Sequence, residues 1–287
     1  MNTKQKFGGP WTVEKLNILS DYLNFYATAL KKQPFKLIYI DAFAGTGHIN
    51  IGDNVDEIID GSAKLALQSN GNFTEYIFIE KNEKFATELS SMVKHDFPHK
   101  AHKVCILNED CNQALLKICK KVDWDHVRAV LFLDPYAASV EWSTLKTISE
   151  THAIDVWYLF PFNATTRMLK KTGEINPAWE NKLNAIFGTE SWKTDLYQED
   201  PQTNLFGETN QIRIADTIAL QRYIETRLKT IFPSVSKHSR ILHNSRSSPL
   251  FLFCFAVSNQ SEKAQKLALS VADYILRDKT SKNFLRS

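Results

Sequence analysis

One short stretch of the chain, Asp41–Gly47, joins an acidic strand end to a glycine loop. It follows the apolar run Leu37–Ile40, which is typical of a buried strand. Glycine has no Cβ and tolerates positive φ, so a loop containing Gly45 and Gly47 lets backbone N–H groups approach a ligand closely. The stretch therefore predicts a strand that ends in a ligand-binding turn.

Acidic residues also end three later strands. Glu80, Asp110 and Asp134 each follow an apolar run, as Asp41 does. The carboxyl ends of parallel strands meet at one edge of a sheet, where open α/β proteins bind nucleotides. The four positions together predict a nucleoside-bearing cofactor lying across that edge.

Strands and helices are expected to alternate along the first half of the chain. Strands are predicted at 37–40, 76–79, 103–107, 129–133 and 154–160, and helices at 11–32, 62–67, 83–94, 113–121 and 141–150. The region 48–60 shows no clear period and is expected to be a loop. Runs so short, apolar and β-branched between helices favour a parallel sheet covered on both faces.

The pattern changes after Pro161. Residues 162–210 are polar and rich in glycine and proline, and they are interpreted as an insertion or substrate-side subdomain with one or two short helices, one at 179–186. A long helix is expected at about 212–231, strands at 238–243 and 250–257, and a closing helix at 262–276. Because only 244–249 separate those two strands, they cannot be parallel. The last strand is therefore predicted to be antiparallel.

The overall composition fits one α/β domain spanning 1–287. With 287 residues and 43% hydrophobic content the chain can bury a full core, and a formal net charge of +3 permits a nucleic-acid partner without requiring one. The four cysteines lack CxxC spacing, which argues against a structural metal and favours a reducing, cytoplasmic compartment. No apolar stretch has membrane-spanning length, so no membrane association is expected.

The glycine loop has to be weighed against a dinucleotide site. An NAD fingerprint needs a third small residue, but the loop runs into Asn50, and Glu80 lies beyond the acidic position that NAD requires. The D-x-F-x-G-x-G pattern instead resembles the first motif of class I S-adenosylmethionine (SAM)-dependent methyltransferases. A structural turn without a ligand is the remaining alternative. The predicted cofactor-binding residues are Asp41, Phe43, Gly45, Thr46, Gly47, Glu80 and Asp110.

Two of these carboxylates have structural alternatives. Glu80 is either a solvated strand end or a bidentate acceptor for two ribose hydroxyls. Asp110 either caps the helix that follows it or accepts a hydrogen bond from an adenine amino group, and the two roles are compatible. Glu109 is an alternative to Asp110.

The sequence Asp134-Pro135-Tyr136 ends the fourth strand and is the predicted catalytic element. It resembles the (D/N)-P-P-(Y/F) motif of class I enzymes that methylate exocyclic amines, except that the second proline is missing. The resemblance implies that Asp134 and Pro135 accept hydrogen bonds from the target amine and that Tyr136 stacks on a base taken out of its helix. A helix-capping turn is the structural alternative.

Other residues remain open. Arg167 either pairs with a phosphate or carboxylate of a substrate or is a solvated helix residue. The segment Phe7–Trp11, with Lys15, either folds over the cofactor or anchors the first helix. The insertion's Trp179, Trp192 and Tyr197 either stack bases or form a small satellite core.

The combined pattern resembles the three-Cys-motif partner protein family. The resembling segments are 8–12 with Lys15 and Leu16, 39–47, 78–80, 133–136, 160–161 with Arg167, 186–188 with Trp192, and 249–251 with Ser258 and Asn259. The resemblance implies a bacterial, methyltransferase-like protein with a Rossmann-like class I fold: a mostly parallel seven-stranded sheet, an antiparallel C-terminal strand and helices on both faces. It also implies a partner with a three-cysteine, radical-enzyme-like motif.

The expected function is SAM-dependent methyl transfer to an amine, with a nucleobase of DNA or RNA as the expected acceptor. The alternative is a SAM-binding, non-catalytic module that works with the three-Cys partner. A NAD-dependent oxidoreductase is a third possibility, but the sequence offers no evident base for hydride chemistry.

Overall fold

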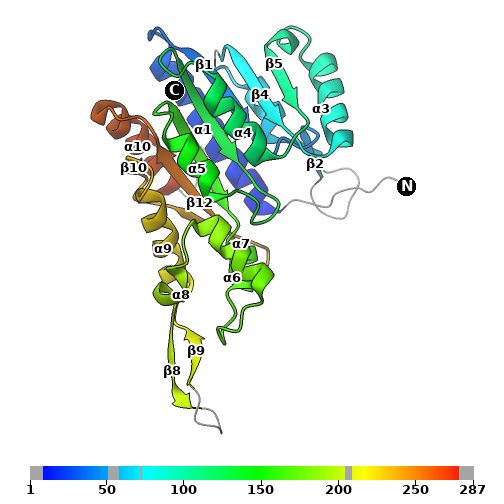
Figure 1. Ribbon diagram of the computed structural model, residues 1–287. Coiled ribbons are helices and arrows are strands. Elements are labelled where there is room, and N and C mark those ends of the chain that lie inside the picture. Colours follow the sequence, from blue (N-terminus) through cyan, green and yellow to red (C-terminus); the bar gives the residue numbers. More distant parts are fainter. Residues whose placement is uncertain (1–8, 51–57, 72, 204–208, 278–287) are drawn as a thin grey trace.

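The centre of the molecule is a mixed sheet of eight strands. The computed structural model describes residues 9–50, 58–71, 73–203 and 209–277. The strand order is β10-β12-β7-β6-β1-β4-β5, with β11 also paired to β12 (Figure 1). The parallel strands are β1 (Lys36–Asp41), β4 (Glu75–Ile79), β5 (Val104–Leu107), β6 (Val127–Leu133) and β7 (Ile154–Phe160). The antiparallel strands are β10 (Ser234–Val235), β11 (Arg240–His243) and β12 (Pro249–Val257).

Helices cover both faces of this sheet. One face packs against α4 (Cys111–Lys121), α5 (Trp142–Ser149), α7 (Pro177–Phe187) and α9 (Thr217–Lys229). The other packs against α1 (Pro10–Leu30), α2 (Ser62–Gln68), α3 (Glu83–Asp96) and α10 (Glu262–Arg277). The fold is a Rossmann-like class I methyltransferase fold, as the sequence predicts. The two-residue strand β10 adds to the seven strands expected.

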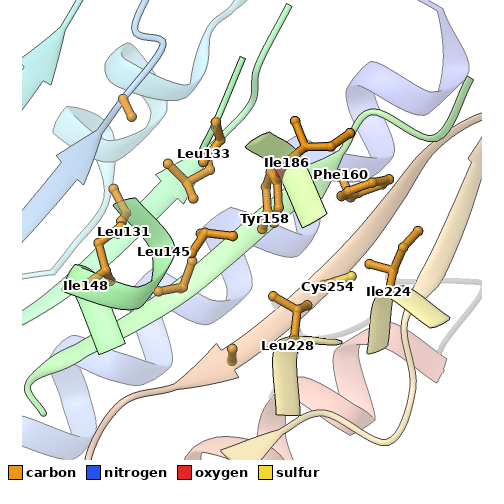
Figure 2. Close-up of a cluster of buried hydrophobic side chains, with 14 of the residues drawn as sticks. Leu131, Leu133, Leu145, Ile148, Tyr158, Phe160, Ile186, Ile224, Leu228 and Cys254 are labelled. Atoms are coloured by element: carbon orange, nitrogen blue, oxygen red, sulfur yellow. The ribbon is translucent and has the colours of Figure 1, made fainter. Parts of the chain in front are cut away.

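Side chains of the central strands alternate between the two clusters. On β6, Leu131 and Leu133 belong to one cluster and Val130 and Phe132 to the other, because successive residues of a strand point to opposite faces. Figure 2 shows the first cluster, where Leu131 and Leu133 lie near Leu145 of α5. A strand buried on both faces needs a continuous apolar run, which is why these strands can be recognised in the sequence.

The segment between β1 and α2 differs from the expected loop. His48–Asn50 forms β2, which pairs in antiparallel fashion with β3 (Ile58–Asp60). Residues 51–57 lie outside the described part of the chain. Three-residue strands are too short to show a period, so sequence patterning misses them.

The region after β7 contains more regular structure than expected. It forms α6 (Phe162–Met168), α7, α8 (Trp192–Asp195) and a hairpin of β8 (Tyr197–Thr203) and β9 (Thr209–Arg213). Figure 1 shows the hairpin extending away from the sheet beyond α8. The expected helix at 212–231 therefore begins late, at Thr217. Ile212 pairs with Gln198 across the hairpin, and the Asp216 carboxylate caps the helix by accepting from the Ala219 amide at 2.8 Å.

Helix α1 is attached to the sheet through a buried hydrogen bond. The Tyr22 hydroxyl donates to Asp155 Oδ2 at 2.6 Å, and both residues are buried. Burial disfavours the charged carboxylate and raises the pKa of Asp155 to about 7, although the Tyr22 hydrogen bond and the Arg128 charge act in the opposite direction. The folded state therefore holds this proton over a pH range in which the unfolded chain has lost it.

We expect this proton to make stability depend on pH. The ordinary pKa is 3.8, so the free energy of unfolding should fall as the pH rises from about 4 to about 7 and should change little above that. Asp155→Asn removes the titration and should flatten this part of the profile. Urea unfolding at about pH 5 and about pH 8 measures the difference. The exposed Asp125→Asn is the control, and an unchanged profile in Asp155→Asn contradicts the assignment.

Candidate functional site

A cavity of about 660 Å³ lies at the carboxyl edge of the parallel strands. It is located where the strand order reverses, because the chain runs from β1 out to β4 and β5 and then crosses to β6 on the other side of β1. Such a crevice is where open α/β sheets bind ligands. The predicted site residues that line it are Phe43, Gly45, Thr46, Gly47, Glu80, Asp110, Asp134, Pro135 and Tyr136.

The glycine loop leaves its main chain exposed to this cavity. Gly45 and Gly47 have φ of 60° and 85°, a region that favours glycine. A Cβ on Gly45 would meet no atom within 4 Å, so the glycine keeps a side chain out of the cavity. At Gly47 a Cβ would lie 2.5 Å from Met92 Cε, which shows that the loop packs closely on α3.

Asp41 lies beneath the loop and is not among the described residues that line the cavity. It is fully buried, and one of its oxygens accepts a hydrogen bond from the Phe43 amide at 3.2 Å. Burial raises its pKa to about 6, while hydrogen bonds from Ser62, the Phe43 amide and Tyr39 act in the opposite direction. The geometry gives Asp41 the role of holding the loop from below.

Glu80 connects the loop to the end of β4. Its Oε2 accepts from the Gly45 amide at 2.9 Å, and its Oε1 accepts from the Asn82 amide at 2.7 Å. Each carboxylate oxygen keeps a further lone pair for another donor. Glu80 is therefore both a structural support of the loop and a candidate ligand acceptor on the cavity wall.

Asp110 caps α4, which is one of its two predicted roles. Its Oδ1 accepts from the Asn112 amide at 3.0 Å, and its Oδ2 pairs with Lys81 at 3.3 Å. Burial acts to raise its pKa, but the hydrogen bonds from Lys81 and Asn112 outweigh burial and lower the pKa overall. The carboxylate thus stays ionised at the β5 end of the cavity. Glu109 also lines the cavity and pairs with Lys117 at 2.6 Å.

Asp134 forms an ion pair with Lys15 of α1. The Lys15 ammonium donates to Asp134 Oδ2, and the exposed fractions of the two side chains are 5% and 20%. The Lys15 Nζ also lies 4.8 Å from the centroid of the Trp11 ring, a cation–π distance. A helix that precedes the sheet thus supplies a charge to the end of β6.

Aromatic rings line the same cavity as this pair. Trp11 and Phe251 line the cavity with their ring centroids 5.1 Å apart, and Tyr136, another lining residue, is 74% exposed. Planar apolar surface beside a hydrogen-bonding group suits a flat, polar ligand. Trp11 and Lys15 therefore line the cavity itself, while Phe7 and Gly8 of the opening segment lie outside the described residues.

The remaining candidates lie away from the cavity walls. Arg167 is exposed near the end of α6 and is not among the described lining residues. Trp192 and Tyr197 are buried in the large hydrophobic cluster on one face of the sheet, and the Trp192 Nε1 donates to Asn184 at 2.8 Å. The two rings therefore belong to the main core, not to a separate satellite core, and do not stack bases. Trp179 is 36% exposed, with Lys170 above its ring.

Sequence reasoning did not find the pairing of Lys15 with Asp134 or the contribution of Phe251. Lys15 and Asp134 are 119 positions apart, and Phe251 belongs to a strand whose apolar run indicates only a core. A signal for Lys15 existed in its spacing of one helical turn from Trp11, which places both side chains on one face of α1. Nothing in the sequence indicates that this face meets β6.

The fold is similar to several solved structures at low identity. Protein LPL1258 from Legionella pneumophila, of family-model DUF519, aligns with 13% identity and a TM-score of 0.47 over 90% of this chain and 91% of that chain. Trm1 from Pyrococcus horikoshii, in a complex with S-adenosyl-L-methionine, aligns with 12% identity and a TM-score of 0.49 over 91% and 58%. Spermidine synthase from Thermotoga maritima aligns with 10% identity and a TM-score of 0.40 over 88% and 61%.

No family model and no curated protein matches the sequence. Among the described residues, no helix is both long and apolar enough to cross a bilayer. The solved structures share with this chain a general course of the backbone.

The two hydrogen bonds of Glu80 make a prediction about the loop. Glu80→Ala removes the acceptor of the Gly45 amide, so hydrogen exchange at that amide should speed up by about ten- to a hundredfold, the range for losing a hydrogen bond to a charged group. Glu109→Ala is the matched control, because this carboxylate lines the same cavity and bonds to Lys117 instead of the loop. Equal exchange in the two variants contradicts the role of Glu80.

Proposed function

We propose that the protein is a SAM-dependent methyltransferase that acts on an amine, specifically on a nucleobase of DNA or RNA. One observation carries the proposal: a single cavity joins two chemically different halves. Gly45, Glu80 and Asp110 line one half, at the ends of β1, β4 and β5. Asp134 and Tyr136, which follow β6, line the other. This is the arrangement that a donor and an acceptor lying side by side require.

The first half has groups that fit the cofactor. The exposed main chain at Gly45 would hold the methionine part, because a Cβ there meets open space. Glu80 would accept from the ribose hydroxyls, and Asp110, kept ionised by Lys81, from the adenine amino group. Phe43, Thr46 and Gly47 would complete this half, with Asp41 supporting the loop. When bound, the cofactor supplies an electrophilic methyl group.

The second half has groups that fit an amine on a planar ring. Asp134 would accept a hydrogen bond from the amine and so raise its nucleophilicity, and the main-chain carbonyl of Pro135 is a second acceptor beside it. Tyr136, with 74% of its surface exposed, offers a ring face for stacking. A base inside a duplex cannot reach such a cavity, so the target would be single-stranded or flipped out.

The second candidate function is a SAM-binding module without transfer activity. We propose membership of the three-Cys-motif partner family on the sequence resemblance, and with it a three-cysteine partner protein. Ile214, which follows β9, and Ile218, in the first turn of α9, are 50% and 57% exposed, which supports a protein contact beside the hairpin. In this case the cavity would sense the cofactor for the partner.

Calorimetric titration with S-adenosylhomocysteine tests the cofactor half. We expect a dissociation constant on the order of micromolar. Glu80→Ala should abolish binding, because the same carboxylate supports the loop and would accept hydrogen bonds from the ribose hydroxyls. Glu150→Ala, an exposed carboxylate at the end of α5, is the control variant, and NAD is the control ligand. Absence of binding by folded protein overturns the cofactor assignment.

The acceptor half is tested by substitution of Asp134. Asp134→Ala should lower transfer of labelled methyl groups to nucleic-acid pools by at least about a hundredfold, the scale for losing one positioned catalytic group, and leave the S-adenosylhomocysteine affinity within about threefold. Asp134→Asn keeps an acceptor oxygen, so its transfer rate should lie between those of the wild-type protein and Asp134→Ala. A large loss of cofactor affinity in both variants would make Asp134 a cofactor residue. If the wild-type protein and both variants transfer no methyl groups, the SAM-binding module without transfer activity is favoured.

A further inference from the structure

The Lys15 ammonium has more donors than the described residues use. Its side chain is 5% exposed and lines the cavity, and an ammonium carries three N–H donors. In the described part of the chain, the hydrogen bond to Asp134 Oδ2 is the one that Nζ makes. Buried donors nearly always have partners. A cavity-lining ammonium with spare donors therefore points to an acceptor atom on a ligand.

The position of Lys15 is fixed by contacts along α1. At the start of the helix, the Thr12 hydroxyl accepts from the amide of Gly9, the residue before Pro10, at 3.1 Å. Next to Lys15, the Glu14 carboxylate pairs with Arg240 of β11 at 2.5 Å. Farther along, Tyr22 bonds to Asp155 of β7. These attachments hold α1 against the sheet, so the ammonium and the Asp134 carboxylate have a defined arrangement before any ligand binds.

A hydrogen-bond donor and a hydrogen-bond acceptor thus lie side by side and are available to the substrate that receives the methyl group. Lys15 offers N–H donors, and Asp134 has a second oxygen, Oδ1, which makes no hydrogen bond to the described residues. A ligand edge that carries an N–H donor beside an acceptor atom complements both. The aromatic rings of Trp11, Phe251 and Tyr136 in the same cavity favour a planar ligand.

We propose that Lys15 is a specificity-determining residue that binds the unprotonated ring nitrogen next to the reacting amine. The acceptor would then be adenine or cytosine, the bases in which an exocyclic amine adjoins such a nitrogen on the pairing edge. This inference rests on the proposed function and narrows it. Asp134 would bind the amine and Lys15 the ring nitrogen beside it, so the pair would hold the base at two adjacent atoms.

The experiment measures coupling between Lys15 and that nitrogen. The substrates are short random-sequence single strands of RNA and DNA, made with the normal bases or with adenine or cytosine in which C–H replaces the ring nitrogen beside the amine. The replacement should slow methyl transfer by wild-type protein by about ten- to a hundredfold, as expected for losing a hydrogen bond to a charged group. Lys15→Met should transfer methyl groups slowly to normal strands. On the altered strands its transfer rate should fall by less than about threefold further.

Two further variants separate recognition from folding. Lys15→Arg keeps a cationic donor and should restore part of the sensitivity to the ring nitrogen. Lys31→Met replaces an exposed lysine at the other end of α1 and should behave as wild type. Calorimetry with S-adenosylhomocysteine checks that each variant is folded and binds the cofactor.

The outcomes distinguish the inference from the proposed function. If wild-type protein methylates normal and altered strands equally well, or if Lys15→Met lowers both by the same factor, Lys15 does not bind the ring nitrogen and the inference is wrong. Transfer to guanine alone has the same consequence, while methyl transfer itself stands. If S-adenosylhomocysteine binds but no strand is methylated, the nucleobase acceptor is wrong and the inference fails with it.

Discussion

Both faces of the parallel sheet are buried, and this burial decides where polar side chains can lie. Helices cover each face, so the interior strands can carry few polar side chains, and β6 is apolar from Ala129 to Leu133. Polar chemistry is thereby confined to the strand ends. Asp41, Glu80 and Asp134 stand at or directly after the last residue of a strand for this reason, and Asp110 follows in the short connection from β5 to α4. The strand order then determines which of them meet.

The sequence predicts the parts of the fold that follow from local patterns. Buried strands need apolar runs, and the last strand had to be antiparallel because 244–249 are too short for a crossover. The capping role of Asp110 was likewise visible in its position. The start of α9 was not, because Ile212 has an apolar side chain that suits a helix but pairs with Gln198 in a hairpin. Contacts between distant segments, such as Lys15 with Asp134, arise from tertiary packing and leave no local pattern.

Two buried carboxylates, Asp41 at the end of β1 and Asp155 near the start of β7, differ in what their burial does. Asp155 has a tyrosine hydroxyl as its hydrogen-bond donor, and burial raises its pKa to about 7. Asp41 receives hydrogen bonds from the Phe43 amide, Tyr39 and Ser62, and burial raises its pKa to about 6. Those hydrogen bonds stabilise the charged form of Asp41 and oppose the effect of burial. The first carboxylate attaches a helix, and the second orders the loop that borders the cavity.

The ion pair between Lys15 and Asp134 is difficult to explain by stability alone. Removing two charges from water costs free energy that their attraction often does not repay, and apolar pairs of similar size are frequently as stable. The neighbouring rings of Trp11 and Phe251 would accommodate such an apolar pair. A lysine with spare donors next to a carboxylate with a spare oxygen instead has the composition of a binding site. The Lys15–Asp134 pair is therefore better explained as part of a binding site than as a contact that stabilises the fold.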